Sequence, residues 1–168
     1  MQAITSYRVP FLVRVMNPLL QPVLRLGLRA GPAVLLTVRG RKSGRMHTTP
    51  VGVFERDGQR WLFAEFGHVN WVRNLRATPR AEIRLGRWRE SVRAIELSPT
   101  DAAAVIRDVV VPWLRSPSGR MAAGMAGASL LSHPPNAPVA DFLIEAKRYP
   151  VFEVKAALAD EPAQPRKS

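Results

Sequence analysis

The segment from residue 48 to residue 66 reads TTPVGVFERDGQRWLFAEF. Residues 48–56 carry the β-branched and aromatic side chains that favour a strand, and Arg60–Phe66 returns to that composition. Between them stand Asp57 and Gly58, a pair that favours the tight turn of a β-hairpin because both tolerate a positive φ. The segment therefore predicts two antiparallel strands that turn at Asp57 and Gly58.

More strands extend from both ends of this hairpin. Residues 33–38 predict a buried strand, residues 81–97 predict two strands that turn at Gly86, and Val151–Val154 predicts a last strand. Consecutive strands joined by hairpins favour an antiparallel sheet, and five or six such strands often close into a barrel. The expected fold is mainly β within the α+β class: a small antiparallel barrel with an N-terminal helix and flanking helices.

The helices and the chain ends complete this prediction. One domain is expected over residues 1–158, with a helical segment at 1–30 and a disordered tail at 159–168. Charges and prolines interrupt the apolar-rich stretch 9–36, so it is too polar for a membrane span but could lie on a membrane surface. The Gly-, Ala- and Met-rich segment 116–138 predicts a flexible loop or lid that contains a weak helix. The predicted helices are residues 7–29, a short one within 67–79, one from Ser98 to about Trp113, and 139–148.

The charge of the chain favours anionic partners. The formal net charge is +12, and 21 of the 25 basic residues are arginine, whose planar fork matches phosphate and carboxylate oxygens. Nucleic acid, an acidic lipid surface and a phosphorylated cofactor are all compatible with this charge. Cysteine is absent, which excludes disulfides and suits the cytoplasm. The three histidines lack metal-ligand spacing, so no metal site is predicted.

A cationic loop follows the first predicted strand. Four basic residues fall within seven positions, and two glycines bracket the loop at Gly40 and Gly44. Glycine lets backbone N–H groups come close to a ligand and form an anion-binding concavity. The loop therefore predicts a phosphate grip, with a solvated hairpin tip as the alternative. The four cations are Arg39, Arg41, Lys42 and Arg45.

A second segment, residues 67–79, combines an aromatic face with a polar edge. Trp71 and Leu75 lie four residues apart and so share one face of a helix. Asn70, Arg73 and Asn74 can form a neighbouring polar edge. Trp71 could close a binding site or pack on the core, and Asn74 could contact a ligand or serve as a cap or turn residue.

Taken together, the two segments resemble a known family. The pattern is Gly40-Arg-Lys-Ser-Gly44, then Thr48-Thr-Pro50, a hairpin, and Trp71-x-x-Asn-Leu-x-Ala-x-Pro79. Its order and spacing resemble the deazaflavin (coenzyme F420)-dependent nitroreductase/quinone reductase family, over about residues 5–98 and 139–156. The resemblance implies a split β-barrel related to flavin reductases and pyridoxamine-phosphate oxidases. It also implies coenzyme F420, in preference to FMN, and hydride transfer to a small conjugated acceptor such as a quinone, a nitroaromatic or an enone.

The resemblance further implies a cofactor site. The loop would hold the phosphate and glutamyl tail, the following strand would lie along the deazaflavin ring, and residues 64–67 and the short helix would close the site. The residues implied are Arg41, Lys42, Ser43, His47, Thr49, Pro50, Val51, Ala64, Phe66, Gly67, Trp71 and Asn74. No catalytic residue is assigned, because the cofactor does the hydride chemistry and the protein positions it.

Three features depart from the family pattern. His47 stands where the family usually has an arginine, Glu65 places an acid near an anionic cofactor, and the helix before the last strand has no tyrosine. Two other classes of function stay open. One is a non-catalytic split-barrel protein that binds a flavin, haem or fatty acid. The other is a binder of nucleic acid or of an anionic membrane.

The expected partners follow from the preferred function. They are a small-molecule acceptor, no specific nucleic acid, and a membrane surface touched peripherally by the N-terminal helix. The protein is expected to be a monomer or homodimer. Its expected location is the cytoplasm, with the inner face of the membrane as a variant of that location.

Overall fold

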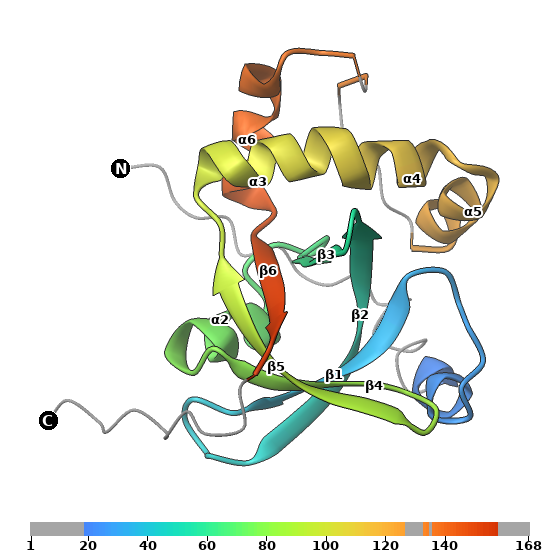
Figure 1. Ribbon diagram of the computed structural model, residues 1–168, viewed down its shortest axis with the longest axis vertical. Coiled ribbons are helices and arrows are strands. Elements are labelled where there is room, and N and C mark those ends of the chain that lie inside the picture. Colours follow the sequence, from blue (N-terminus) through green and yellow to red (C-terminus); the bar gives the residue numbers. More distant parts are fainter. Residues whose placement is uncertain (1–18, 127–132, 135, 158–168) are drawn as a thin grey trace, which may run out of the picture.

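Six antiparallel strands form a closed barrel in the computed structural model, which describes residues 19–126, 133–134 and 136–157. Around the wall the order is β1-β2-β3-β6-β5-β4, and β4 pairs back onto β1. Figure 1 shows the strands beneath a layer of helices. The small antiparallel barrel predicted from the sequence is confirmed. The strands are β1 (Ala33–Arg39), β2 (Met46–Arg56), β3 (Gln59–Phe63), β4 (Arg80–Leu85), β5 (Trp88–Glu96) and β6 (Val151–Ala156).

The β2–β3 hairpin forms where the sequence predicts it. Asp57 and Gly58 have φ angles of 52° and 75°, the positive pair that a two-residue hairpin turn requires. Arg56 pairs with Gln59 across the turn, which fixes the register of both strands. β2 begins at Met46, two residues before the predicted start, because its pairing with β1 continues to that position.

Two hydrophobic cores lie on opposite sides of the barrel wall. Side chains alternate along a strand, so one set points into the barrel and the other points out beneath the helices. The inner core includes Leu62 and Phe152, and the outer core includes Phe63 and Phe142. Leu62 and Phe63 are neighbours on β3 and belong to different cores, so this strand is buried on both faces.

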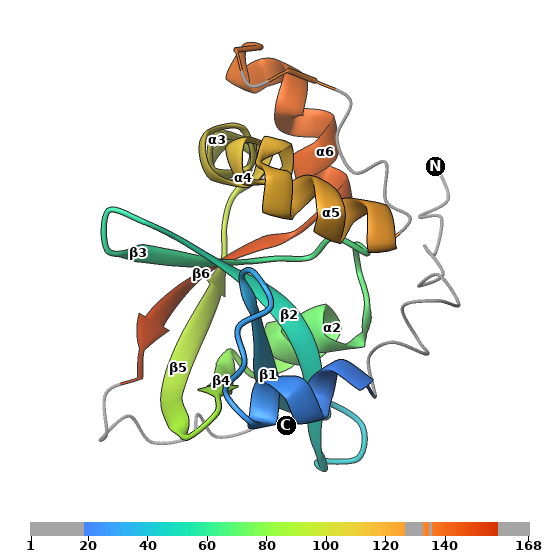
Figure 2. The same cartoon turned by 90° about the vertical axis from the view of Figure 1, so that its right-hand side faces the viewer.

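Helices cover one end of the barrel and one of its sides. Figure 2 shows α3, α4, α5 and α6 gathered above the strands, with α2 below them, where it packs against β1. The predicted cap at Ser98 is present, since Ser98 Oγ accepts a hydrogen bond from Asp101 N–H at 3.2 Å. The segment 116–138, predicted as a loop or lid with a weak helix, begins with the helix α5. The elements are α2 (Asn70–Ala77), α3 (Pro99–Val105), the π-helical η1 (Ile106–Val110), α4 (Val111–Arg115), α5 (Pro117–Ala126), the 3₁₀ helix η2 (Val139–Phe142) and α6 (Leu143–Arg148).

A short helix at residues 19–25 lies against the turn between β4 and β5. Gly86 N–H donates to Leu24 O at 2.8 Å. A Cβ at Gly86 would lie 2.8 Å from Gly27 Cα, so the two backbones come together only because both residues are glycine. In the described part of the chain no helix has the length and apolarity needed to cross a bilayer. Residues 1–18 of the predicted N-terminal segment and the predicted tail, 159–168, lie outside the described residues.

Candidate functional site

A cavity of about 630 Å³ opens between β2, α2 and two loops, within the volume range of small-molecule and cofactor sites. The end of β1, the loop 40–45, the first half of β2, the segment 63–69 and α2 enclose it. Ten of the twelve residues implied by the family resemblance line it. Its lining residues are Val38, Gly40, Arg41, Lys42, Ser43, His47, Thr49, Pro50, Val51, Phe63, Glu65, Phe66, His68, Val69, Asn70, Trp71, Arg73 and Asn74.

Backbone hydrogen bonds fold the cationic loop into a closed turn. Gly40 N–H donates to Arg45 O at 2.7 Å, which brings the ends of the loop together. The four cations that lie together in the sequence are separated in the structure. Arg41 and Lys42 line the cavity, whereas Arg39 and Arg45 do not. Two cations and a hydroxyl therefore remain to receive an anion. They are Arg41, Lys42 and Ser43.

Asn74 holds this loop against α2. Its side chain is 4% exposed, and its Oδ1 accepts hydrogen bonds from Arg41 N–H at 3.3 Å and from Arg41 Nη1 at 3.0 Å. One amide oxygen thereby fixes both the backbone and the guanidinium of Arg41. A cap or turn role alone would not account for these bonds to a residue 33 positions away.

His47 faces the cavity from the start of β2. It pairs with Val38, and it alternates with Thr48, whose Oγ1 hydrogen-bonds Thr37 Oγ1 at 2.9 Å on the other face of the sheet. A Cβ at Gly40 would lie 2.8 Å from His47 Nε2. The imidazole can therefore lie over the loop only because position 40 has no side chain.

The rest of β2 and α2 supply the less polar walls of the cavity. Thr49, Pro50 and Val51 follow His47 along β2, and Val51 is 6% exposed. On α2, the ring of Trp71 lies 5.8 Å from the ring of Phe152 in the inner core. Trp71 therefore packs on the barrel core and also lines the cavity.

The turn after β3 removes two of the implied residues from the cavity wall. β3 ends at Phe63, where its pairing with β6 stops, rather than at Phe66 as predicted. Ala64 N–H then donates to Pro150 O at 2.9 Å, and Gly67 N–H donates to Ala64 O at 2.8 Å. Ala64 and Gly67 are buried in this turn, and neither lines the cavity. Between Ala64 and Gly67, the side chains of Glu65 and Phe66 line the cavity.

Glu65 is the one carboxylic acid among the described residues that line the cavity. Burial raises the pKa of Glu65 to about 7, because the carboxylate loses water that no charged partner replaces. Its neutral and ionised forms are therefore both populated near neutral pH. Its sequence neighbour Phe66 was assigned to the site, but the acid was treated only as a departure from the family pattern.

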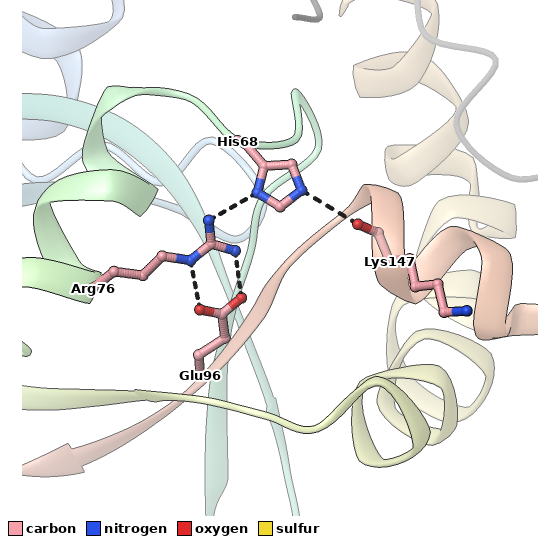
Figure 3. A network of polar contacts seen from close by, with 4 residues as sticks. All are labelled: His68, Arg76, Glu96 and Lys147. Carbon is pink, nitrogen blue, oxygen red and sulfur yellow. Dashed lines mark hydrogen bonds and ion pairs between the residues drawn. The ribbon is translucent and has the colours of Figure 1, made fainter. Parts of the chain in front are cut away.

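His68, which also lines the cavity, belongs to the network shown in Figure 3. Arg76 Nη1 lies 2.9 Å from His68 Nδ1, and a guanidinium only donates, so Nδ1 accepts and the ring is neutral. Nε2 is then the protonated nitrogen and donates to Lys147 O at 3.3 Å. Arg76 is itself held by two bonds to Glu96, at 2.6 and 2.7 Å. The network ties the turn after β3 to α2, β5 and α6.

Sequence reasoning did not assign eight of the lining residues. For Asn70 and Arg73 the signal was present, because their helical spacing places them on the polar edge beside Asn74. No sequence signal pointed to His68, because its position depends on Lys147, which is 79 residues away. The eight are Val38, Gly40, Phe63, Glu65, His68, Val69, Asn70 and Arg73.

A closed six-stranded antiparallel barrel with flanking helices, and with a cavity lined by both cationic and apolar side chains, defines the class of the protein as a split β-barrel. Within that class, the chain belongs to the F420H(2)-dependent quinone reductase family, whose model matches residues 23–118, more than half of the 168 residues. The protein is therefore an oxidoreductase that uses coenzyme F420, as the resemblance implied. A comparison with curated proteins finds no match.

Several solved structures are similar to the chain. An F420-H2 dependent reductase is 22% identical, covering 74% of this chain and 94% of its own, with a TM-score of 0.43. A FAD-binding protein from Mesorhizobium loti is 15% identical, covering 82% and 87%, with a TM-score of 0.43. A heme-binding protein from Mycobacterium smegmatis is 14% identical, covering 79% and 49%, with a TM-score of 0.40. The family assignment rests on the match over residues 23–118.

The donor set of the cavity fits coenzyme F420. This cofactor joins a flat deazaflavin ring to an anionic phosphate and glutamyl arm. Arg41 and Lys42 suit the arm, because charge-assisted hydrogen bonds to phosphate are among the strongest that a protein makes. Val51, Phe66 and Trp71 suit the ring, because they offer apolar surface to a flat aromatic system.

Proposed function

We propose that this cavity holds F420 with its anionic arm at Arg41, Lys42 and Ser43, and its ring against β2, Phe66 and Trp71. The acceptor is then a small conjugated molecule that reaches the exposed face of the ring: a quinone, a nitroaromatic or an enone. The observation that supports this proposal is that one cavity is lined both by the loop cations Arg41 and Lys42 and by the apolar side chains of Val51, Phe66 and Trp71.

In this proposal the side chains bind and orient, and they take no part in the hydride step. Asn74 keeps the guanidinium of Arg41 turned toward the arm, since it holds Arg41 at two points. Trp71, supported by Phe152, keeps the ring pressed toward β2. The bound cofactor, when reduced, supplies a hydride to the acceptor. The protein contributes by fixing the distance and orientation of the two reactants.

A titration with F420, FMN and FAD, followed by fluorescence, tests the cofactor assignment. F420 should bind, and the two flavins should bind more weakly. Oxidation of reduced F420 by a quinone, a nitroaromatic and an enone then ranks the acceptor classes. Binding of F420 without turnover of any acceptor would contradict catalysis and favour a storage or carrier role.

His47 should make F420 binding depend on pH. A phosphate beside the imidazole favours its charged form, so binding takes up a proton and weakens as the pH rises from about 5.5 to 8.5. A His47→Gln variant should bind more weakly at low pH and lose this dependence. A His47→Arg variant, which stays charged, should bind tightly across the range. Identical pH profiles for the wild type and His47→Gln would remove His47 from the cofactor site.

We also propose that the protein touches an anionic membrane at one end of the barrel. The close approach of Gly27 and Gly86 places residues 25–29 beside the β4–β5 turn. Apolar side chains flanked by arginines are typical of peripheral membrane contact, and tryptophan favours the interface. Phosphatidylglycerol vesicles should co-sediment with the wild type, and with a smaller fraction of a Trp88→Ser variant. Phosphatidylcholine vesicles should co-sediment with neither protein. The exposed residues at this end are Leu26 (79%), Leu28 (59%) and Trp88 (49%), with Arg25, Arg29, Arg87 and Arg89.

We propose that the chain works in the cytoplasm as one domain, either as a monomer or as a homodimer. The absence of cysteine supports a reducing compartment. The single domain is supported by the two cores, which share one barrel wall and so cannot form independently. Sedimentation equilibrium would distinguish the monomer from the homodimer.

A further inference from the structure

The cavity contains an acid that hydride transfer itself does not use. Glu65 lines the cavity beside Phe63 and Phe66. Within the described residues, no side chain or backbone group donates a hydrogen bond to it or pairs with it, and burial is the cause of its raised pKa. An unpaired carboxyl that has lost water is costly to keep ionised, and carboxyls of this kind gather at functional sites.

We propose that Glu65 is the acid that protonates the acceptor after hydride transfer. This assignment rests on the proposed function of the cavity. It names a catalytic residue where the sequence alone offers none.

The backbone around Glu65 is fixed, as a proton donor requires. Ala64 is bonded to Pro150 before it, and the Gly67 N–H returns to Ala64 O after it. One position further on, His68 is tied to α2 and α6 by the network of Figure 3. The Glu65 side chain therefore leaves a turn held on both sides, and it points to the same cavity that is proposed to hold the reactants.

The other groups in the cavity are less suited to this role. The neutral His68 already uses both ring nitrogens, one with Arg76 and one with Lys147 O. His47 lies over the cationic loop, where the anionic arm is placed. The serine and threonine hydroxyls that line the cavity are far weaker acids than a carboxyl group.

The charged groups around Glu65 come from every wall of the cavity. The loop 40–45 contributes Arg41 and Lys42, β2 contributes His47, and α2 contributes Arg73. Arg148, at the end of α6, lies behind the turn, since a Cβ at Gly67 would meet Arg148 O at 3.0 Å. None of these cations forms an ion pair with Glu65, so its proton stays available near neutral pH.

The proton step balances as follows. Reduced F420, when bound, would supply a hydride with its two electrons, and the acceptor would become an anion. The O–H bond of Glu65 breaks, a new O–H bond forms on the acceptor, and Glu65 is left as a carboxylate. Oxidation of the cofactor also releases one proton, so a proton taken from water restores Glu65 with no net consumption. Overall the acceptor gains two hydrogens and the cofactor loses two.

The test compares Glu65→Gln with Glu65→Asp and with Glu55→Gln, a matched change at an exposed residue toward the far end of β2. With menadione as the acceptor, the wild-type kcat should fall by about tenfold per pH unit above about pH 7. Glu65→Gln should reduce kcat by about 10²-fold or more at low pH and flatten the profile, in line with general acid catalysis. Glu65→Asp should retain part of the rate, and Glu55→Gln should match the wild type.

Infrared difference spectra of the protein without cofactor provide a readout that does not depend on activity. A protonated carboxyl band should disappear from the wild type as the pH rises through about 7 and should be absent from Glu65→Gln. A Glu65 that is already ionised at pH 5.5 would overturn the proposal. So would a Glu65→Gln variant that binds F420 and keeps both the wild-type kcat and its pH profile. A wild type that binds no F420 would instead overturn the proposed function and, with it, this role.

Discussion

A Lys42→Ala variant is expected to bind F420 about 10- to 150-fold more weakly than the wild type. The expectation follows from the loss of one charge-assisted hydrogen bond, which costs roughly 1.5–3 kcal/mol. Lys42 lines the cavity on the cationic loop and has no anionic partner among the described residues that would compete with a ligand. The dependence of affinity on salt should weaken in parallel, because one fewer cation attracts the anionic arm. Fluorescence titrations at low and high salt measure both effects.

Arg45→Ala is the matched control for that experiment. Arg45 lies on the same loop and carries the same charge, but its side chain does not line the cavity. The change removes one positive charge from the loop without removing a cavity contact, so only a small, salt-sensitive effect is expected. Equal losses for Lys42→Ala and Arg45→Ala would show that the loop acts through its total charge and not through a directed contact.

A Phe152→Ala variant should lose about 3–5 kcal/mol of unfolding free energy, the usual cost of removing a fully buried phenylalanine ring. Phe152 is 1% exposed in the inner core, and its ring lies 5.8 Å from that of Trp71. The same change should weaken F420 binding, because it removes the support beneath one wall of the cavity. Denaturant unfolding and F420 titration measure the two effects separately.

Phe142→Ala makes the same chemical change in the outer core. Phe142 is fully buried, contacts the ring of His133, and lies outside the cavity lining. Its loss should lower stability by a similar amount and leave F420 affinity unchanged in the folded protein. If either alanine variant fails to fold, Phe152→Leu and Phe142→Leu keep most of the volume and allow the same comparison. Equal effects of both leucine changes on affinity would contradict a specific link between Phe152 and the cavity.

The barrel could be predicted from the sequence because its strongest signals are local. Asp57 and Gly58 define a turn through their own backbone preferences, and the strands on either side are recognisable by composition. The last strand is recognisable in the same way, but its place between β3 and β5 is not, because that depends on closure of the whole sheet. The end of β3 was misplaced by three residues for a similar reason, since Phe66 has a strand-like composition but β6 offers it no partner.

The candidate site was predictable to the extent that it is contiguous in sequence. The loop 40–45 and the start of β2 form one run of the chain, and their residues reach the cavity as expected. Ala64 and Gly67 do not line the cavity, because the turn that buries them is closed by Pro150, far along the chain. The sequence also did not predict which of the four cations face the cavity and which face solvent. That arrangement depends on how the loop folds, and the hydrogen bond between Gly40 and Arg45 closes the loop.

The position of β6 has a consequence for the order in which the protein matures during synthesis. The last of the six described strands in chain order fits between β3 and β5, so a chain synthesised only to residue 150 lacks the strand that closes the barrel. Until that strand is added, β3 and β5 are free edges, which are sites of pairing with other chains. The support of Trp71 by Phe152 also waits for this strand. A chain that stalls before β6 is therefore exposed to aggregation through two open sheet edges, and its cavity lacks the ring that supports Trp71.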